Sequence, residues 1–217
     1  MRRKLLKLGL LVLVGVLLIP TTSSFGQEQS VRILIDDFEV INDWWSYEAG
    51  SNYFGCQITN SGYESNNALE ITFDVGKTGS PGCGYDQFIA NAFWTNTEGL
   101  EFNWRANLSY MAIIVMVRME DFTQTNPDAD GLTDFEAVVL TDGDTWSIGQ
   151  VAWSDFVKSD WLGKSGVDVL DPSRIVTMIF SVAEWERGTV WIDNLYAVEH
   201  LPEVANDLSN ITPVEIP

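Results

Sequence analysis

The 217-residue chain is poor in histidine (one), cysteine (two) and basic residues (twelve). The only histidine, His200, lies near the end of the chain, which excludes a Ser/His/Asp or Cys/His catalytic group inside the domain. Zinc chemistry lacks its usual ligands for the same reason. The twelve Lys and Arg face 31 Asp and Glu, so the formal net charge is −19. A chain this acidic repels nucleic acid and anionic membranes and suits neutral ligands or cations.

The first 26 residues have the pattern of an export signal. A basic start is followed by an apolar run, Leu8 to Ile19, that is too short to span a bilayer. Small residues precede a cut after Gly26, so 1–26 is predicted to be a signal peptide and the protein to be secreted, extracellular or periplasmic. A membrane anchor is the alternative. Without the four basic residues of this leader, eight Lys and Arg face 31 Asp and Glu, a net charge of −23.

The two cysteines are Cys56 and Cys83. In an exported protein, an even pair most simply forms a disulfide bond. Two free thiols are the alternative. We expect the bond to clamp the loop before Tyr85.

Residues 31–199 read as one domain of about ten short strands between Gly, Asp and Pro turns, without a convincing amphipathic helix. This pattern predicts an all-β, antiparallel sandwich of the jelly-roll type, with a polar tail over 200–217. The expected strands start at Val31, and the others cover 53–59, 68–75, 85–94, 100–104, 111–119, 135–140, 146–152, 175–182 and 189–198.

The first strand runs directly into a segment with three acids around Phe38. Carboxylates at that density are costly to bury unless something pairs them, and a hard cation is the natural partner where basic residues are few. If the first and last strands lie side by side, Asp193 joins Asp37 and Glu39. We therefore predict one structural Ca²⁺ on these three acids, with backbone carbonyls from 62–66.

A second oxygen-rich pattern lies in the connection from Asn126 to Asp134. It partly resembles an EF-hand loop, but Ala137 stands where the closing Glu is needed. A second Ca²⁺ or a plain hairpin loop are the two interpretations.

Nine Trp and six Tyr are many for this length. Trp104, Trp146 and Trp191 lie at alternating strand positions and are expected to pack in the core. Others lie at strand ends or in loops beside acids. Aromatic rings stack on the C–H faces of sugar rings while carboxylates accept hydrogen bonds from hydroxyl groups, so these residues predict a glycan-binding surface: Trp45, Tyr47, Tyr85, Trp161 and Trp185.

Three segments carry a family resemblance. Ile35 to Tyr47 resembles the Leu-Asp-Asp-Phe-Glu…Trp-Gly-Ser-Tyr opening of family 11 carbohydrate-binding modules, which occur beside bacterial β-glucanases. Trp146 to Phe156 resembles that family's Trp…Ile-Pro-Phe-Ser-Ser-Phe segment, and Gly188 to Leu195 resembles its Gly-x-x-x-x-Asp-Asn-Ile ending. The similarity covers 33–198.

The resemblance implies a galactose-binding-like sandwich with structural calcium. Its concave face would bind mixed-linkage β-1,3-1,4-glucan or cellulose without cleaving it, in glucan catabolism beside a glucanase. The family's polar and His/Tyr contacts on the next-to-last strand fall here on Thr177, Ile179 and Val182, so two polar contacts are lost. The family's binding positions fall here on Tyr47, Tyr85, Asp130, Lys158, Asp160 and Trp161.

Two other functions stay open. The Asp-Phe-Glu start is shared with the domain resembling complex I intermediate-associated protein 30, a non-sugar scaffold that would not need exposed aromatic residues in a groove. A glucanase is the other hypothesis, because a glycosidase needs only two carboxylates at a set separation. No spacing singles out such a pair.

Overall fold

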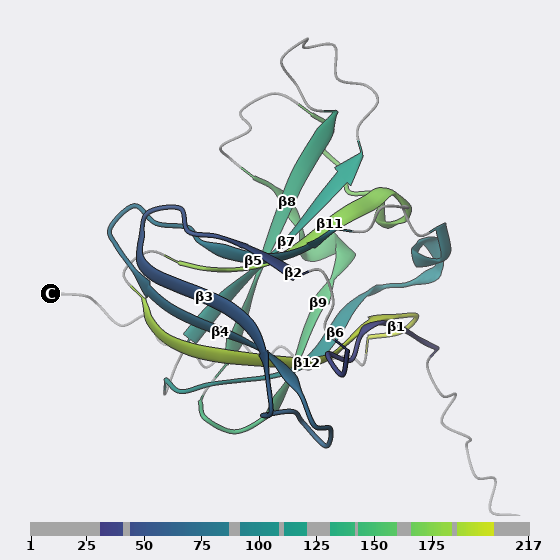
Figure 1. The fold of residues 1–217 in the computed structure, drawn as a ribbon. Coiled ribbons are helices and arrows are strands. Elements are labelled where there is room, and N and C mark those ends of the chain that lie inside the picture. The colour runs from purple at the N-terminus through teal and green to yellow at the C-terminus, as the bar shows by residue number, and fades with distance from the viewer. Residues whose placement is uncertain are drawn as a thin grey trace, which may run out of the picture.

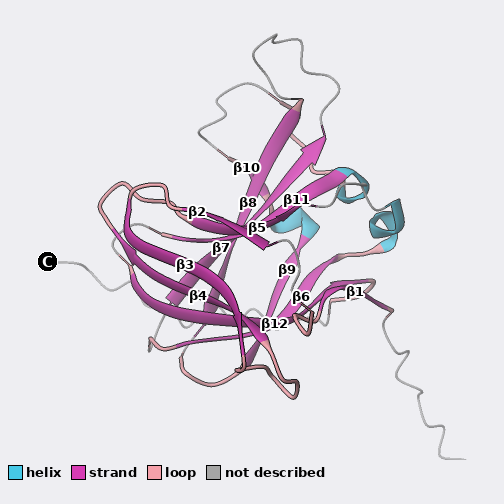
Figure 2. Ribbon diagram, in the orientation of Figure 1, coloured by secondary structure: helices cyan, strands magenta, loops and turns pink. Residues whose placement is uncertain are grey.

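Two antiparallel sheets pack face to face in the computed structural model, which describes residues 31–40, 44–86, 92–108, 111–120, 131–141, 143–159, 166–183 and 186–201 (Figures 1 and 2). The fold class predicted from the strand pattern is therefore confirmed. Within the described residues, no helix is long and apolar enough to cross a membrane.

Sheet A has the strand order β3-β4-β12-β6-β9, with β1 also paired to β12. Figure 1 shows its long strands β3, β4 and β12 curving together below sheet B. The bounds are β1 (Arg32–Asp36), β3 (Ser51–Thr59), β4 (Ala68–Val75), β6 (Gly99–Ala106), β9 (Ser147–Ala152) and β12 (Arg187–Val198).

Sheet B has the order β10-β8-β7-β11-β5-β2. Its edge strand β2 (Trp44–Tyr47) pairs with the short strand β5 (Gly82–Asp86). The remaining strands are β7 (Met111–Glu120), β8 (Leu132–Thr141), β10 (Val157–Lys158) and β11 (Ile175–Val182), and the 3₁₀ turns are η1 (Ala92–Asn96), η2 (Trp153–Asp155) and η4 (Pro172–Arg174).

The core lies between the sheets because alternate residues of each strand are apolar and point to the same face. In β4, for example, Leu69, Ile71 and Phe73 are all buried. Phe102 of sheet A meets Phe180 of sheet B edge to face, with ring centroids 5.4 Å apart, so aromatic packing joins the two layers directly.

The first and last strands are neighbours, as predicted. β1 pairs antiparallel with the end of β12, with Ile33 opposite Ala197. The predicted disulfide is also confirmed: Cys56 of β3 is bonded to Cys83 of β5, with their Cα atoms 5.9 Å apart. Because β3 belongs to sheet A and β5 to sheet B, the bond ties the two layers together.

One expected strand, 85–94, is wrong. β5 ends at Asp86, and Trp94 lies in the 3₁₀ turn η1. Trp94 is buried by stacking on Trp153, with ring centroids 5.8 Å apart and planes 18° from parallel. Apolar residues near a strand end can be buried by such a turn as well as by a sheet, so the apolar run alone does not distinguish the two.

Candidate functional site

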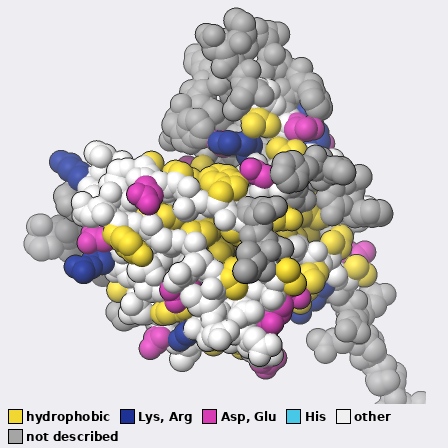
Figure 3. All heavy atoms as spheres, viewed as in Figure 1, with side chains coloured by type: hydrophobic (Ala, Val, Ile, Leu, Met, Phe, Trp, Pro, Cys, Tyr) yellow, Lys and Arg dark blue, Asp and Glu magenta, His cyan; other side chains and the backbone are white. Residues whose placement is uncertain are grey.

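The outer face of sheet B carries a hollow of about 580 Å³, which we call the groove. It crosses β2, β11, β7 and β8, and it is mainly apolar with one charged pair. Figure 3 shows hydrophobic side chains at the surface over β2 and β5, beside basic and acidic ones. The described residues that line the groove are Trp45, Tyr47, Ser80, Met116, Arg118, Asp134 and Ile179.

The two aromatic rings of the groove lie against glycines of the neighbouring strand. Trp45 is paired with Gly84, and Tyr47 is paired with Gly82. A Cβ atom added at Gly84 would lie 2.5 Å from Cζ2 of Trp45, and one at Gly82 would lie 2.5 Å from Cε1 of Tyr47. Only a residue without a side chain admits such contacts. The glycines thus let both rings rest on the sheet, with their centroids 6.0 Å apart.

Arg118 and Asp134 form the charged pair of the groove. They are cross-strand partners on β7 and β8. The Nε of Arg118 donates to Oδ1 of Asp134 over 2.7 Å, and an Nη donates to Oδ2 over 3.1 Å, which is a bidentate arrangement. The Asp134 side chain is only 4% exposed and that of Arg118 is 30% exposed. The guanidinium therefore fixes a buried carboxylate and itself remains partly open to solvent.

The polar atoms of the two rings differ in their surroundings. Burial raises the pKa of the Tyr47 hydroxyl, with Ser181 and Ser80 as nearby hydrogen-bonding groups that act in the opposite direction. The hydroxyl is therefore protonated at neutral pH and can donate. The buried indole N–H of Trp45 has no hydrogen-bond partner among the described residues.

Of the residues predicted to bind ligand, Tyr47 lies in the groove and Tyr85 does not. Tyr85 is paired with Trp44, so its side chain points to the core face of the sheet, where the two rings stack with centroids 5.5 Å apart. The two predicted tyrosines thus lie on opposite faces and do not form one platform. The physical reason is the two-residue period of a strand: in β5 the glycines face out, so Tyr85 faces in.

The other predicted ligand contacts lie elsewhere. Lys158 pairs with Asp168 over 2.5 Å and is not among the groove residues. Asp130, Asp160 and Trp161 fall outside the described residues.

Two of the three acids predicted to bind calcium meet at one loop. Oε1 of Glu39 accepts the backbone N–H groups of Asn66 and Asn67, and Oδ2 of Asp193 accepts the N–H of Tyr63 and the hydroxyl of Ser65. Burial raises the pKa of the Asp193 carboxyl, whereas hydrogen bonds, first that from Asn67, lower the pKa of Glu39.

The third acid, Asp37, forms a local hydrogen bond within its own segment. Oδ1 of Asp37 accepts the N–H of Glu39 over 3.2 Å. Asp36 is buried, and its oxygens accept the N–H of Phe38 and the indole N–H of Trp44. Among the described residues, no group of three or more His, Cys, Asp or Glu side chains is arranged to hold a metal ion. The calcium site stays a prediction.

The second candidate calcium loop can be followed only at its end. Residues 121–130 fall outside the described residues, and Asp134 is held by Arg118. The three residues that stand at the family's contact positions on the next-to-last strand differ in their surroundings. The hydroxyl of Thr177 donates to Asp86 on the outer face, Ile179 lines the groove, and Val182 is buried.

The sequence analysis placed Trp45 near a glycan surface and Ile179 at a family contact position, but it did not assign Ser80, Met116, Arg118 or Asp134 to the groove. Met116, Arg118, Asp134 and Ile179 are far apart in sequence and come together only through the pairing of β7 with β8 and β11. One local signal was available: Gly82-x-Gly84 places two glycines on one strand face, where a neighbouring strand can lay aromatic rings.

Comparison with known proteins gives matches among solved structures only: no protein-family model matches the chain, and no curated protein does. A family 11 carbohydrate-binding module from Clostridium thermocellum, in complex with a β-1,3-1,4-mixed-linked tetrasaccharide, is 19% identical with a TM-score of 0.63, over 77% of this chain and 95% of that one. The family 11 module of a cellulosomal cellulase of C. thermocellum is 18% identical with a TM-score of 0.64, over 80% and 98%.

A family 30 carbohydrate-binding module of another C. thermocellum cellulosomal cellulase is 14% identical, with a TM-score of 0.55, over 77% of this chain and 95% of that one. These likenesses extend over most of each chain, at identities that establish the fold. The chain therefore has the antiparallel β-sandwich fold of the family 11 carbohydrate-binding modules, the family that its sequence resembles.

Proposed function

We propose that the protein is a secreted, non-catalytic module that binds β-glucan chains in the groove. The observation that carries the proposal is the pair of rings, Trp45 and Tyr47, resting on Gly84 and Gly82 in a hollow of about 580 Å³. Rings held against a sheet can stack on the apolar faces of successive sugars, and such stacking costs little entropy because packing already fixes the rings.

The charges of the groove support a neutral, hydroxyl-rich ligand. Asp134 and Arg118 neutralise each other, and Arg118 is the more exposed of the two. The chain as a whole is strongly acidic, which disfavours anionic ligands. Among the structural neighbours, one was solved with a mixed-linkage glucan tetrasaccharide, which supports mixed-linkage glucan or cellulose as the substrate class.

Binding without cleavage is part of the proposal. Glycoside hydrolysis needs two carboxylates at a set separation. The described lining of the groove supplies one, Asp134, which is bound to Arg118. A neighbouring module belongs to a cellulosomal cellulase, which supports an association with a glucanase here. Incubation with barley β-glucan is expected to release no new reducing ends.

The main test is calorimetric titration of barley β-glucan into the parent, Trp45→Ala and Tyr47→Ala. Each lost ring should weaken binding about two- to twelve-fold, from roughly 0.5–1.5 kcal/mol per aromatic contact. Tyr196→Ala is the control, because Tyr196 belongs to sheet A and packs under Arg32. Unchanged affinity in both groove variants, or no binding by the parent, would reject the groove and favour the non-sugar scaffold.

Calcium binding by Glu39 and Asp193 is a second part of the proposal. Both carry carboxylate oxygens, the kind of ligand that Ca²⁺ prefers, beside the loop 62–67, and the described residues show no ion pair that involves the buried Asp193. A bound cation would favour the charged form of that carboxylate.

Ligand binding to the native state alone stabilises by about 3–4 kcal/mol at 100–1,000 times Kd. EDTA should therefore lower the melting temperature, and Asp193→Ala should abolish the effect of EDTA. The control, Asp144→Ala at an exposed acid, should leave the EDTA effect intact. A melt that EDTA does not change would remove calcium from the proposal without affecting the groove.

A further inference from the structure

The outer face of sheet A is a regular grid of side chains. Its middle row consists of short side chains. Gly55 of β3 pairs with Thr72 of β4, and Thr72 pairs with Thr189 of β12. Thr72 precedes Asp74 by two residues and therefore lies on the same face. The row on one side is Tyr53, Asp74 and Arg187. The row on the other side is Gln57, Glu70, Trp191 and Arg105. Two rows of long side chains therefore flank a row of short ones.

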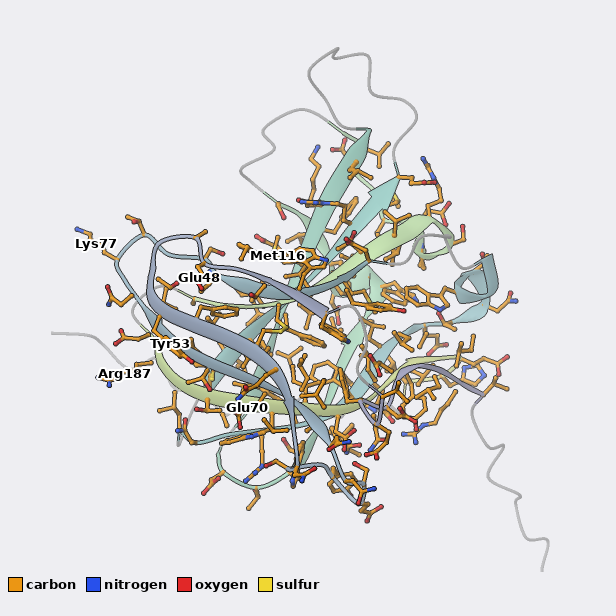
Figure 4. The ribbon with its side chains drawn as sticks, in the orientation of Figure 1. Glu48, Tyr53, Glu70, Lys77, Met116 and Arg187 are labelled. Carbon is orange, nitrogen blue, oxygen red and sulfur yellow. A yellow bond between two sulfur atoms is a disulfide. The ribbon has the colours of Figure 1, made fainter. Side chains whose placement is uncertain are left out.

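A hollow of about 430 Å³, which we call the trough, lies at this short row. Figure 4 shows Tyr53 and Arg187 together at one side of sheet A, away from Met116 in the groove. The described residues that line the trough are Tyr53, Thr72, Phe73, Asp74, Asn107, Arg187, Gly188 and Thr189.

Tyr53 rests on a glycine, as the rings of the groove do. A Cβ atom added at Gly55 would lie 2.9 Å from the hydroxyl oxygen of Tyr53 and 3.5 Å from Cζ. The ring thus lies along its own strand, over the position two residues further on, and its side chain is 57% exposed. An aromatic ring that is open to solvent beside hydroxyl and amide groups suits the C–H face of a sugar.

The charged groups of the trough are paired. Oδ2 of Asp74 lies 3.7 Å from Nε of Arg187, and Oδ1 accepts the amide N–H of Asn52 over 3.1 Å. The lining therefore presents donors and acceptors without a net charge. This balance favours a neutral polyhydroxyl ligand over a phosphate or a carboxylate.

The next row of sheet A, beyond the residues that line the trough, is held by contacts of its own. Trp191 donates its indole N–H to Glu70 over 2.8 Å, and Arg105 stacks 4.2 Å above its ring and 5.3 Å from that of Trp146. Trp146 and Trp191 were expected in the core. They are half-buried instead: Trp191 alternates with core residues along β12, Trp146 directly precedes β9, and the guanidinium of Arg105 lies over both rings. Only Trp104 of the three is fully buried.

We propose that the trough is a second carbohydrate-binding surface, on the face opposite the groove, that stacks a neutral sugar ring on Tyr53. A chain with two such surfaces could hold two glucan strands or two turns of one strand. Each site would then be weak alone and stronger together, through effective concentration.

The test follows backbone amide chemical shifts of the secreted protein during titration with the mixed-linkage β-1,3-1,4 tetrasaccharide, a ligand too short to bridge both faces. Amides of β3, β4 and β12 should shift independently of those of β2 and β5. Tyr53→Ala should weaken only the first response, about two- to twelve-fold. Thr72→Trp, which fills the floor and keeps Tyr53, should suppress the same response. Tyr196→Ala should change neither.

The outcomes separate the trough from the groove. If only β2 and β5 amides respond in the parent, or if the β3–β4–β12 response survives both trough variants unchanged, the trough is rejected and the groove stands. If the trough amides respond while the groove amides do not, the proposed function of the groove fails and the trough is confirmed.

Discussion

The two outer faces of the sandwich use the same device in different settings. In the groove, Trp45 and Tyr47 lie on glycines of a neighbouring strand and are half-buried. In the trough, Tyr53 lies on a glycine of its own strand and stays mostly exposed. A ring fixed between two strands has little freedom left to lose on binding, whereas an exposed ring must be ordered by the ligand.

The charged pair of the groove is also more buried than that of the trough. Arg118 holds Asp134 in a bidentate, largely buried contact, while Arg187 is 82% exposed and lies 3.7 Å from Asp74. Exposed pairs contribute about 0–1 kcal/mol and yield easily to a competing ligand or to salt. The groove is thus preorganised and the trough adaptable, so we expect the groove to bind more tightly.

The disulfide connects the two regions, and its removal should have the largest effect. Cys56 belongs to the strand of Tyr53, and Cys83 lies between Gly82 and Gly84. Replacing both with Ala should lower the free energy of unfolding by about 3–4 kcal/mol for a loop of this length. Urea denaturation measures it. A loss below about 1 kcal/mol would mean that core packing alone joins the sheets.

The two tyrosines on opposite faces of sheet B should separate stability from binding. Tyr85→Ala removes a ring stacked on Trp44 at the core face, so we expect a loss of about 1–3 kcal/mol in stability and unchanged affinity for barley β-glucan. Tyr47→Ala should mainly reduce affinity. Equal loss of affinity in the two variants would show that Tyr85 contacts the ligand after all.

The glycines beneath the rings, Gly84 in the groove and Gly55 in the trough, allow a matched pair of substitutions. In Gly84→Ala the new Cβ meets the half-buried Trp45 ring at 2.5 Å, and displacing it should cost about 1–3 kcal/mol and weaken glucan binding. In Gly55→Ala it meets the hydroxyl end of an exposed Tyr53, which can swing aside, so the cost should stay within about 0.5 kcal/mol. Thermal melts measure the loss of stability in each variant. A larger loss for Gly55→Ala than for Gly84→Ala would contradict the view that the groove ring is the more tightly held.

The smallest expected effect is the pH response of Glu186, next to Arg187 of the trough. Burial raises its pKa above 4.5, and its Oε2 has no hydrogen-bond partner among the described residues. Because the folded state holds the proton more tightly than the unfolded chain, stability falls as pH rises from about 4.5 through the folded pKa.

Glu186→Gln removes that cost. The variant should melt above the parent at pH 7 and level with it below about pH 4.5, with trough binding unchanged at pH 7. A difference in melting temperature that is the same at pH 4 and pH 7 would contradict the buried charge as its cause.

Much of the fold could be predicted locally. Alternation in 68–75 and 175–182 reflects one face buried on the core, and the structure has strands with the same bounds. The cysteine pair was predicted from number and compartment alone. The prediction of a strand over 85–94 was wrong because Trp94 reaches the core from a 3₁₀ turn. The apolar pattern of the sequence does not distinguish such a turn from a strand.

By itself, the sequence determined the fold class, the disulfide and the neighbouring first and last strands, because strand period and cysteine count are local or simple properties. Which aromatic residues face solvent depends instead on how the strands pair: Tyr47 points outward, Tyr85 inward, and Trp191 outward beneath Arg105. A one-residue change of register reverses every side chain of a strand, and the register is set by the neighbouring strands. The groove and the trough exist because that register places glycines and threonines beside rings that come from distant segments.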